Sequence, residues 1–133
     1  MTRRGTSSRG FTMIELMVVM TIMVVLATIG LAQYRQSIVR TREAVLKEDL
    51  FRMRDAIDQY YADKNVYPST LEALVADGYL RRMPKDPFTE SESSWVPVAA
   101  EADARNPTAQ PGVYDVKSGS EQVALDGTNY ADW

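Results

Sequence analysis

Glu15 is the residue whose chemistry calls for an explanation first. It stands in the stretch RGFTMIELMVV, residues 9–19, and the nineteen residues that follow it, Leu16 to Tyr34, carry no charge. A carboxylate in hydrocarbon costs several kcal/mol, and acids inside membranes usually serve a function. We therefore expect Glu15 to serve a function in this segment. The alternative is an acid that reaches the membrane edge and has no role.

The residue types that are missing narrow the remaining chemistry. The chain has no histidine and no cysteine, which excludes histidine-based triads, imidazole bases and histidine or cysteine zinc sites. A metal site would need oxygen ligands, which favour calcium or magnesium. Phosphate-binding glycine motifs are absent, and the Asp55–Asp58 pair is typical of a solvated helix face, so we expect no enzyme. The net charge of −3 argues against a nucleic-acid partner.

The uncharged segment is long enough to cross a membrane as a helix. Nineteen residues span roughly 28 Å at about 1.5 Å per residue, close to the thickness of a bilayer core. A cleaved secretory signal peptide is the alternative. The length of the run, the acid at its start and the lack of a clear small-x-small cleavage site weigh against it. We expect a retained transmembrane helix over residues 11–34.

The same helix is expected to continue past the membrane segment, over about residues 12–64. No proline precedes Pro68, and Gly30 is the only glycine after Gly10 in that span. Apolar residues then recur at helical spacing, at Leu46, Leu50, Met53, Ile57 and Tyr60. This spacing places them on one face, so the second half of the helix is predicted to be amphipathic and to pack on a small domain.

The segment after this helix predicts a small mixed domain. Asn65 and Pro68 end the helix, Ser69 and Glu72 have the spacing of a capping box, and Gly78 ends a short second helix. Strands are predicted at three apolar runs, Trp95–Val98, Val113–Val116 and Val123–Leu125. The fold class is therefore α+β, with a long N-terminal helix packed on a small C-terminal domain that has a short second helix and a small antiparallel sheet.

The hexapeptide GFTMIE, residues 10–15, follows a short basic leader and precedes the apolar run. It closely resembles the signature of type IV pilins and pseudopilins. The resemblance implies that a prepilin peptidase removes the leader, residues 1–10, by cutting between Gly10 and Phe11, and that the new amine of Phe11 is methylated. It also implies that Glu15 faces the Phe11 amine of an adjacent subunit in a helical filament.

The same resemblance implies a location. The chain would be a single-pass protein of the bacterial inner membrane, with residues 11–34 in lipid before assembly and residues 35–133 as a periplasmic, pilin-like domain. The leader would stay in the cytoplasm until it is cut. Its three arginines, Arg3, Arg4 and Arg9, agree with the excess of positive charge on the cytoplasmic side of membrane proteins.

The rest of the chain resembles one branch of this family. The segments 55–74, 83–88, 112–119 and 125–133 resemble the major pseudopilins of type II secretion systems. The resemblance implies a structural subunit of a pseudopilus that polymerises through its N-terminal helix and drives protein export. Its partners would be further copies, minor pseudopilins and an inner-membrane assembly platform. The alternative is a type IV pilus subunit, for adhesion, motility or DNA uptake, although the lack of a disulfide favours the pseudopilin.

The C-terminal loop carries one further implication. Major pseudopilins commonly bind calcium there, and Asp126 and Asp132 match the two acidic positions of that loop. The backbone carbonyl of Leu125 would supply a further oxygen. Oxygen ligands suit calcium. The loop is short, however, and Asp-Gly is also an ordinary turn signal, so calcium binding and a plain turn both remain open.

Overall fold

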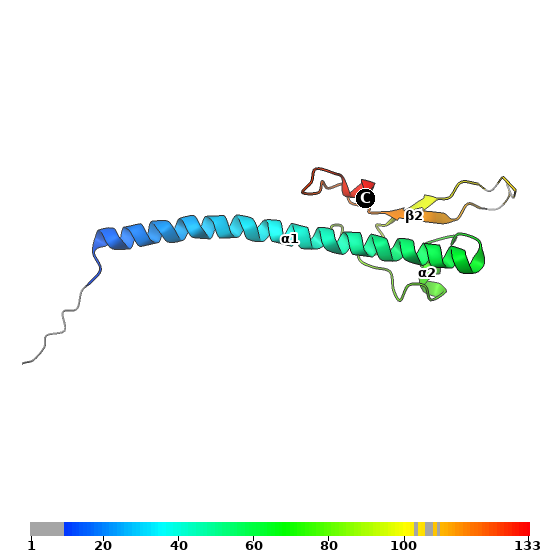
Figure 1. Ribbon diagram of the computed structural model, residues 1–133, viewed down its shortest axis with the longest axis horizontal. Helices are drawn as coiled ribbons and strands as arrows, with labels where there is room; N and C mark the ends of the chain where they lie inside the picture. Colours follow the sequence, from blue (N-terminus) through cyan, green and yellow to red (C-terminus); the bar gives the residue numbers. More distant parts are fainter. Residues whose placement is uncertain (1–9, 103, 106–107, 109) are drawn as a thin grey trace, which may run out of the picture. The chain divides into compact units, whose positions relative to one another are not determined.

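The computed structural model describes residues 10–102, 104–105, 108 and 110–133. Its elements follow in the order α1 (Met13–Lys64), α2 (Glu72–Ala76), β1 (Val96–Ala99), β2 (Val113–Lys117) and the 3-10 helix η1 (Tyr130–Asp132), as Figure 1 traces. One long helix, one short helix and a two-stranded antiparallel sheet confirm the predicted α+β class. The leader residues before Gly10, including the three arginines, lie outside the described residues.

Local chemistry fixes both ends of α1. Thr12 precedes the helix, and its hydroxyl oxygen accepts a hydrogen bond from the N–H of Glu15 at 3.2 Å, as an N-cap residue does. At the other end Asn65 adopts a φ of 54°, and its N–H donates to the carbonyl of Tyr61 at 2.8 Å. A left-handed asparagine is a common helix terminator. The predicted helix of about residues 12–64 is confirmed.

The chain forms two compact units, one that ends at Ile38 and one that comprises Val39–Trp133, and α1 contributes to both. The described part of the first unit is dominated by the apolar half of α1. Its most apolar window has a mean hydropathy of 2.4 and is not buried at all, so this helix is long and apolar enough to cross a membrane. Thr21 and Thr28 donate their hydroxyls to carbonyls four residues back, both at 2.8 Å, which satisfies them inside the helix as lipid requires.

The amphipathic half of α1 supplies one wall of the core of the second unit. Its predicted stripe is buried, namely Leu46, Leu50, Met53, Ile57 and Tyr60. Other elements supply the remainder of this core, chiefly Leu71, Leu74, Trp95, Val113, Val116 and Tyr130. The 3.6-residue periodicity therefore predicted the buried face correctly, because that face has one continuous partner surface.

The capping box predicted at Ser69 is wrong. α2 begins at Glu72, its N-cap residue is Leu71, and no side chain caps it. The backbone just before the helix has another partner, because the carbonyl of Pro68 accepts the N–H of Val113 at 2.8 Å. The chain therefore stays non-helical until Leu71 has entered the core. The predicted stop at Gly78 is correct in kind, since this residue has a φ of 83°.

Two of the three predicted strands form. β1 and β2 pair antiparallel, with Val96 opposite Lys117 and Val98 opposite Asp115, and the register shifts after Val98. The run Val123–Leu125 is not a strand, and its only pairing among the described residues is a single bridge from Val123 to Asn129. The reason is local. The N–H of Ala124 donates to the carbonyl of Thr128 at 2.7 Å, so this segment closes on itself as a tight loop.

Candidate functional site

The predicted processing and assembly residues lie together at the start of α1. Gly10 and Phe11 precede the helix, and the Phe11 side chain is 82% exposed. A side chain built at Gly10 would meet nothing within 4 Å. Glu15 is the third residue of the helix and is exposed. The geometry places an acid within one helical turn of the N-terminus that cleavage would create.

The position of Glu15 in the first turn gives it local support. The N–H of Glu15 is held by Thr12, and a negative side chain in the first turn interacts favourably with the positive end of the helix dipole. That interaction contributes roughly 0.3–1 kcal/mol, whereas burying the carboxylate in a bilayer costs about 3 kcal/mol or more. The helix dipole alone is therefore too weak to offset the burial of a charged Glu15 in lipid, and its pairing with a cationic partner stays a prediction.

The second predicted site, the C-terminal loop, is built around the Asp-Gly turn. One carboxylate oxygen of Asp126, Oδ1, accepts the N–H and the hydroxyl of Thr128 at 3.0 and 2.6 Å. The Thr128 hydroxyl is the main reason that the pKa of Asp126 lies below its ordinary value. Gly127 takes a φ of 87°. The plain turn predicted as one alternative is therefore present, with Asp126 as its first residue.

The donor set of this loop can be compared with what calcium needs. Asp132 stands in η1, where its Oδ2 accepts the side-chain amide of Asn129 at 3.4 Å. Within the described residues, no group of three or more acidic side chains could hold a metal. Calcium would therefore rely on Asp126, Asp132 and backbone oxygens such as that of Leu125. These oxygen ligands are of the type calcium prefers, and calcium binding stays a prediction.

Two residues of α1 that the sequence analysis did not single out fasten the C-terminal segment. Oε1 of Glu43 accepts the N–H of Leu125 at 2.8 Å and the hydroxyl of Tyr130 at 2.9 Å. Arg54 donates to Oδ1 of Asp115 at 2.7 Å and to the carbonyl of Trp133 at 2.6 Å. Both residues belong to the charged part of the helix pattern, which by itself predicts only solvated side chains.

Comparison with known proteins identifies the family. Residues 5–31 match the family described as "Prokaryotic N-terminal methylation motif". The chain is 36% identical to the type II secretion system core protein G of Pectobacterium carotovorum subsp. carotovorum, over 63% of this chain and 64% of that protein. For core protein G of Klebsiella michiganensis the identity is 33%, over 64% and 71%. For that of Pseudomonas aeruginosa it is 38%, over 59% and 67%.

The chain belongs to the type II secretion system core protein G family. This confirms the predicted resemblance to type IV pilin-like proteins and, among them, to the major pseudopilins of type II secretion. It also supports the role of a pseudopilus subunit and favours secretion over a surface pilus. No solved structure matches the chain. The alignments span 64% to 71% of the lengths of these three relatives.

In this member of the core protein G family, a buried aspartate fixes the turn MPKDPF, residues 83–88. Asp86 is fully buried, and its Oδ1 accepts the N–H groups of Phe88 and Thr89 at 2.9 and 3.3 Å. Its Oδ2 accepts the hydroxyl of Ser118 at 2.5 Å. The carboxylate thus joins the turn to the segment that follows β2, and its charge is met by three donors. The sequence pattern did not predict this link to Ser118.

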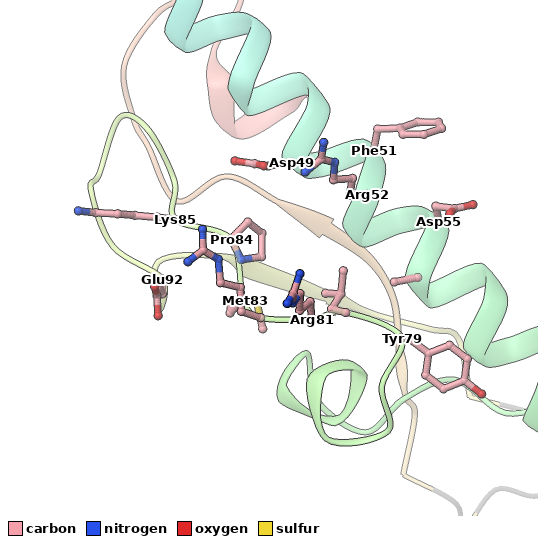
Figure 2. A pocket seen from close by; sticks show the side chains of 13 residues that line it. Asp49, Phe51, Arg52, Asp55, Tyr79, Arg81, Met83, Pro84, Lys85 and Glu92 are labelled. Carbon is pink, nitrogen blue, oxygen red and sulfur yellow. The ribbon is translucent and has the colours of Figure 1, made fainter.

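A groove of about 700 Å³ lies between α1 and the segment that leads into this turn. Figure 2 shows Phe51 and Asp55 of α1 on one side and Arg81 and Lys85 on the other. Partial burial raises the pKa of Asp49, at the same wall, above its ordinary value, although nearby Arg52 acts in the opposite direction. The groove combines basic, acidic and aromatic side chains.

Proposed function

We propose that this core protein G family member polymerises through its N-terminal helix into a pseudopilus that drives protein export. The observation that carries the proposal is the apolar half of α1, which is entirely exposed and begins inside the methylation motif. Exposed apolar area of this extent needs a non-aqueous neighbour. Lipid supplies it before assembly, and the same helices of other copies supply it afterwards. The role is structural, and it requires no catalysis by this chain.

Processing by a prepilin peptidase precedes assembly. The enzyme cuts between Gly10 and Phe11, removes residues 1–10, and the amine of Phe11 is methylated. The match to the methylation motif over residues 5–31 supports this step, as does the open position of Gly10. The anchor then comprises residues 11–34, and residues 35–133 form the domain on the periplasmic side of the inner membrane. Basic residues in the leader favour this orientation.

Glu15 supplies the register between subunits. Its carboxylate meets the amine of Phe11 of an adjacent copy, so that two charges that are costly alone neutralise each other in an apolar surrounding. A helix interface without such a pair can slide, because apolar contacts have no direction. Removing one partner leaves an uncompensated charge, which costs roughly 3–5 kcal/mol. Minor pseudopilins and an inner-membrane assembly platform are the further partners of this step.

The C-terminal loop is proposed to bind calcium through Asp126, Asp132 and the carbonyl of Leu125. Two carboxylates and a carbonyl are suitable oxygen ligands. Calcium should then raise the melting temperature of the full chain in detergent, and magnesium should do so less. The substitution Asp126→Ala should remove this response, whereas Asp58→Ala, on the exposed face of α1, should retain it. If calcium does not change the melting temperature of the wild-type protein, this proposal is wrong.

The experiment that tests the function uses a bacterial strain that has a type II secretion system but lacks its own core protein G. Wild type, Glu15→Lys, Glu15→Asp and Glu121→Lys are expressed in it as full chains. Mass spectrometry of the wild type should give a chain that starts at methylated Phe11. Filaments in sheared fractions and secreted enzyme in the medium are then measured, together with retraction-dependent motility as the sign of a surface pilus.

Glu15→Lys should reduce filaments and secretion at least roughly a hundredfold, as expected for an unpaired buried charge. Glu15→Asp, which keeps the charge, should retain part of both activities. The control Glu121→Lys alters an exposed residue of the second unit and should assemble normally. Wild-type filament formation by Glu15→Lys would show that Glu15 does not dock subunits. Restored motility without restored secretion would mean that the chain builds a surface pilus and not a pseudopilus.

A further inference from the structure

A single carboxylate oxygen of α1 holds two separate points of the C-terminal loop. Oε1 of Glu43 accepts the backbone N–H of Leu125 at 2.8 Å and the side-chain hydroxyl of Tyr130 at 2.9 Å. These donors lie 82 and 87 residues further along the chain. Hydrogen bonds to a charged acceptor are about twice as strong as those between neutral groups. Glu43 therefore fixes both the entry and the exit of the Asp-Gly turn.

The loop has other contacts with α1, but they lie nearer to its end. Lys47 lies 4.5 Å from the centre of the Trp133 ring, and Arg54 donates to the Trp133 carbonyl. Within the loop, the indole N–H of Trp133 donates to the hydroxyl of Thr128 at 2.7 Å. These contacts place Trp133. Glu43 holds the N–H of Leu125 and the hydroxyl of Tyr130.

The ring of Tyr130 fixes the position of the hydroxyl that donates to Glu43. The ring is 1% exposed and stacks on Phe88 with the two centres 3.9 Å apart. Its hydroxyl is thus delivered to a fixed point, and a buried hydroxyl that lost its acceptor would be costly.

We propose that Glu43 is the positioning residue of the C-terminal loop, setting the geometry of residues 125–132 on α1 before and independently of any metal. Its bond to the N–H of Leu125 orients the peptide next to Asp126, and its bond to Tyr130 orients the start of η1, which carries Asp132. The two segments with the proposed calcium ligands are thus anchored to the same oxygen. Only the effect on calcium affinity rests on the calcium proposal above.

The test compares full chains in detergent with a calcium chelator present: wild type, Glu43→Ala, Tyr130→Phe and the double variant. Glu48→Ala is the matched control, because Glu48 is an acid of the same helix whose exposed pair with Arg52 does not involve the loop. Thermal unfolding is followed by the signal of Trp133 in a Trp95→Phe background. Hydrogen exchange of the peptide that contains Leu125 reports on the loop directly.

Glu43→Ala should lower the melting temperature by on the order of 10 °C and speed exchange at Leu125 at least roughly tenfold. Tyr130→Phe should have a smaller effect alone and almost none in the Glu43→Ala background, because the hydroxyl would already lack its acceptor. If Glu43→Ala fails to fold, Glu43→Gln replaces it, because the amide keeps an acceptor oxygen. Glu43→Gln should fold, and its melting temperature should lie below that of wild type and no lower than about that of Tyr130→Phe. Glu48→Ala should change neither measurement.

Two results would overturn the inference. One is a Glu43→Ala protein that melts and exchanges like Glu48→Ala. The other is an effect of Tyr130→Phe that is equally large with and without Glu43. A calcium titration separates the two proposals: Glu43→Ala should weaken calcium binding at least roughly tenfold, by loss of preorganisation. Absence of any calcium response in wild type would remove the calcium proposal, and the comparison in chelator would still decide the role of Glu43.

Discussion

The two halves of α1 are built from similar apolar residues and have opposite surroundings. Met23, in the unit that ends at Ile38, is 61% exposed, whereas Met53, in the second unit, is fully buried. The difference lies in the pattern around them. Charged residues interrupt the second half and leave one apolar stripe, which a single small domain covers. The first half is apolar on all sides, and only lipid or several other helices can cover it.

The first prediction compares a glycine of the second unit, Gly119, with a glycine of the first unit, Gly30. A side chain at Gly119 would overlap the carbonyl oxygen of Ser94, and that backbone cannot move freely because Trp95 beside it is buried and donates to the carbonyl of Pro84. Gly119→Ala should destabilise the second unit by roughly 3 kcal/mol or more, the upper end of the cost of overpacking. At Gly30 a side chain would meet nothing within 4 Å, so Gly30→Ala should strengthen the helix by about 0.5–1 kcal/mol.

Near-ultraviolet circular dichroism in detergent measures the first of these effects, because both tryptophans belong to the second unit. Gly119→Ala should lose this signal at a much lower temperature than wild type. Gly30→Ala should have the same melting temperature as wild type, and amide exchange in the apolar half of its α1 should be slower. Equal melting temperatures for wild type and Gly119→Ala would mean that the backbone near Ser94 yields easily.

The second prediction compares the two methionines directly. Met53→Ala removes buried volume from the core and should cost roughly 2–4 kcal/mol. Met23→Ala should leave the unfolding of the second unit unchanged, since its side chain is exposed in the chain by itself. Its effect should be seen in assembly, where Met23 would contact lipid or other helices. A large loss of stability from Met23→Ala in detergent would contradict the division into a self-sufficient unit and a partner-dependent one.

Local patterns predicted those features that depend on local chemistry. The helix from Met13 to Lys64 and the buried stripe of its second half follow from spacing and from the absence of proline, and the end of the helix follows from Asn65 and Pro68. The methylation motif is likewise read from a few adjacent residues. Such features need no knowledge of the remainder of the fold, because each residue acts on neighbours within one or two helical turns.

Features that join distant parts of the chain were not predictable in this way. Glu43 and Arg54 sit among the charges of α1, and nothing nearby distinguishes them from solvated residues such as Glu48. Their partners lie at least 61 residues away. The strand predicted at Val123–Leu125 is wrong for a reason that is partly local and partly distant. Its apolar composition is compatible with pairing, but the turn at Asp126 and the bonds to Glu43 commit this backbone to a loop.

The third prediction concerns alkaline pH and the bond between Tyr130 and Glu43. The pKa of Tyr130 is raised from 10.0 to about 12, chiefly by burial and then by this bond. The neutral form is thus favoured in the folded state. Its contribution is complete below pH 10 and is lost as the pH rises through 12, a change on the order of 3 kcal/mol.

The measurement is unfolding by denaturant at several pH values, for wild type and Tyr130→Phe. Other groups that titrate in this range are common to both proteins and cancel in the difference. The stability advantage of wild type should be constant up to pH 10 and shrink between pH 10 and 12. A difference that stays constant to pH 12 would show that ionised Tyr130 is tolerated, and that its hydroxyl is not confined against Glu43.

The smallest expected effects concern Thr12 and Ser69, each of which has a glutamate three residues later. Thr12 caps α1 through the N–H of Glu15, whereas Ser69 makes no cap because α2 begins at Glu72. Thr12→Ala should therefore cost about 1 kcal/mol in the first turn of α1, and Ser69→Ala should change α2 by a few tenths at most. In the full chain, amide exchange at Glu15 measures the first turn of α1, and amide exchange at Leu74 measures α2.

This comparison also bears on assembly, since the first turn of α1 is where Glu15 must be held. If Thr12→Ala speeds exchange at Glu15 and reduces filament formation while the second unit melts normally, the cap helps to present the docking charge. Equal effects of Thr12→Ala and Ser69→Ala would mean that neither hydroxyl caps a helix. The two sites share the same four-residue pattern, and only Thr12 has a helix that begins directly after it, so the surrounding fold decides whether the pattern is used.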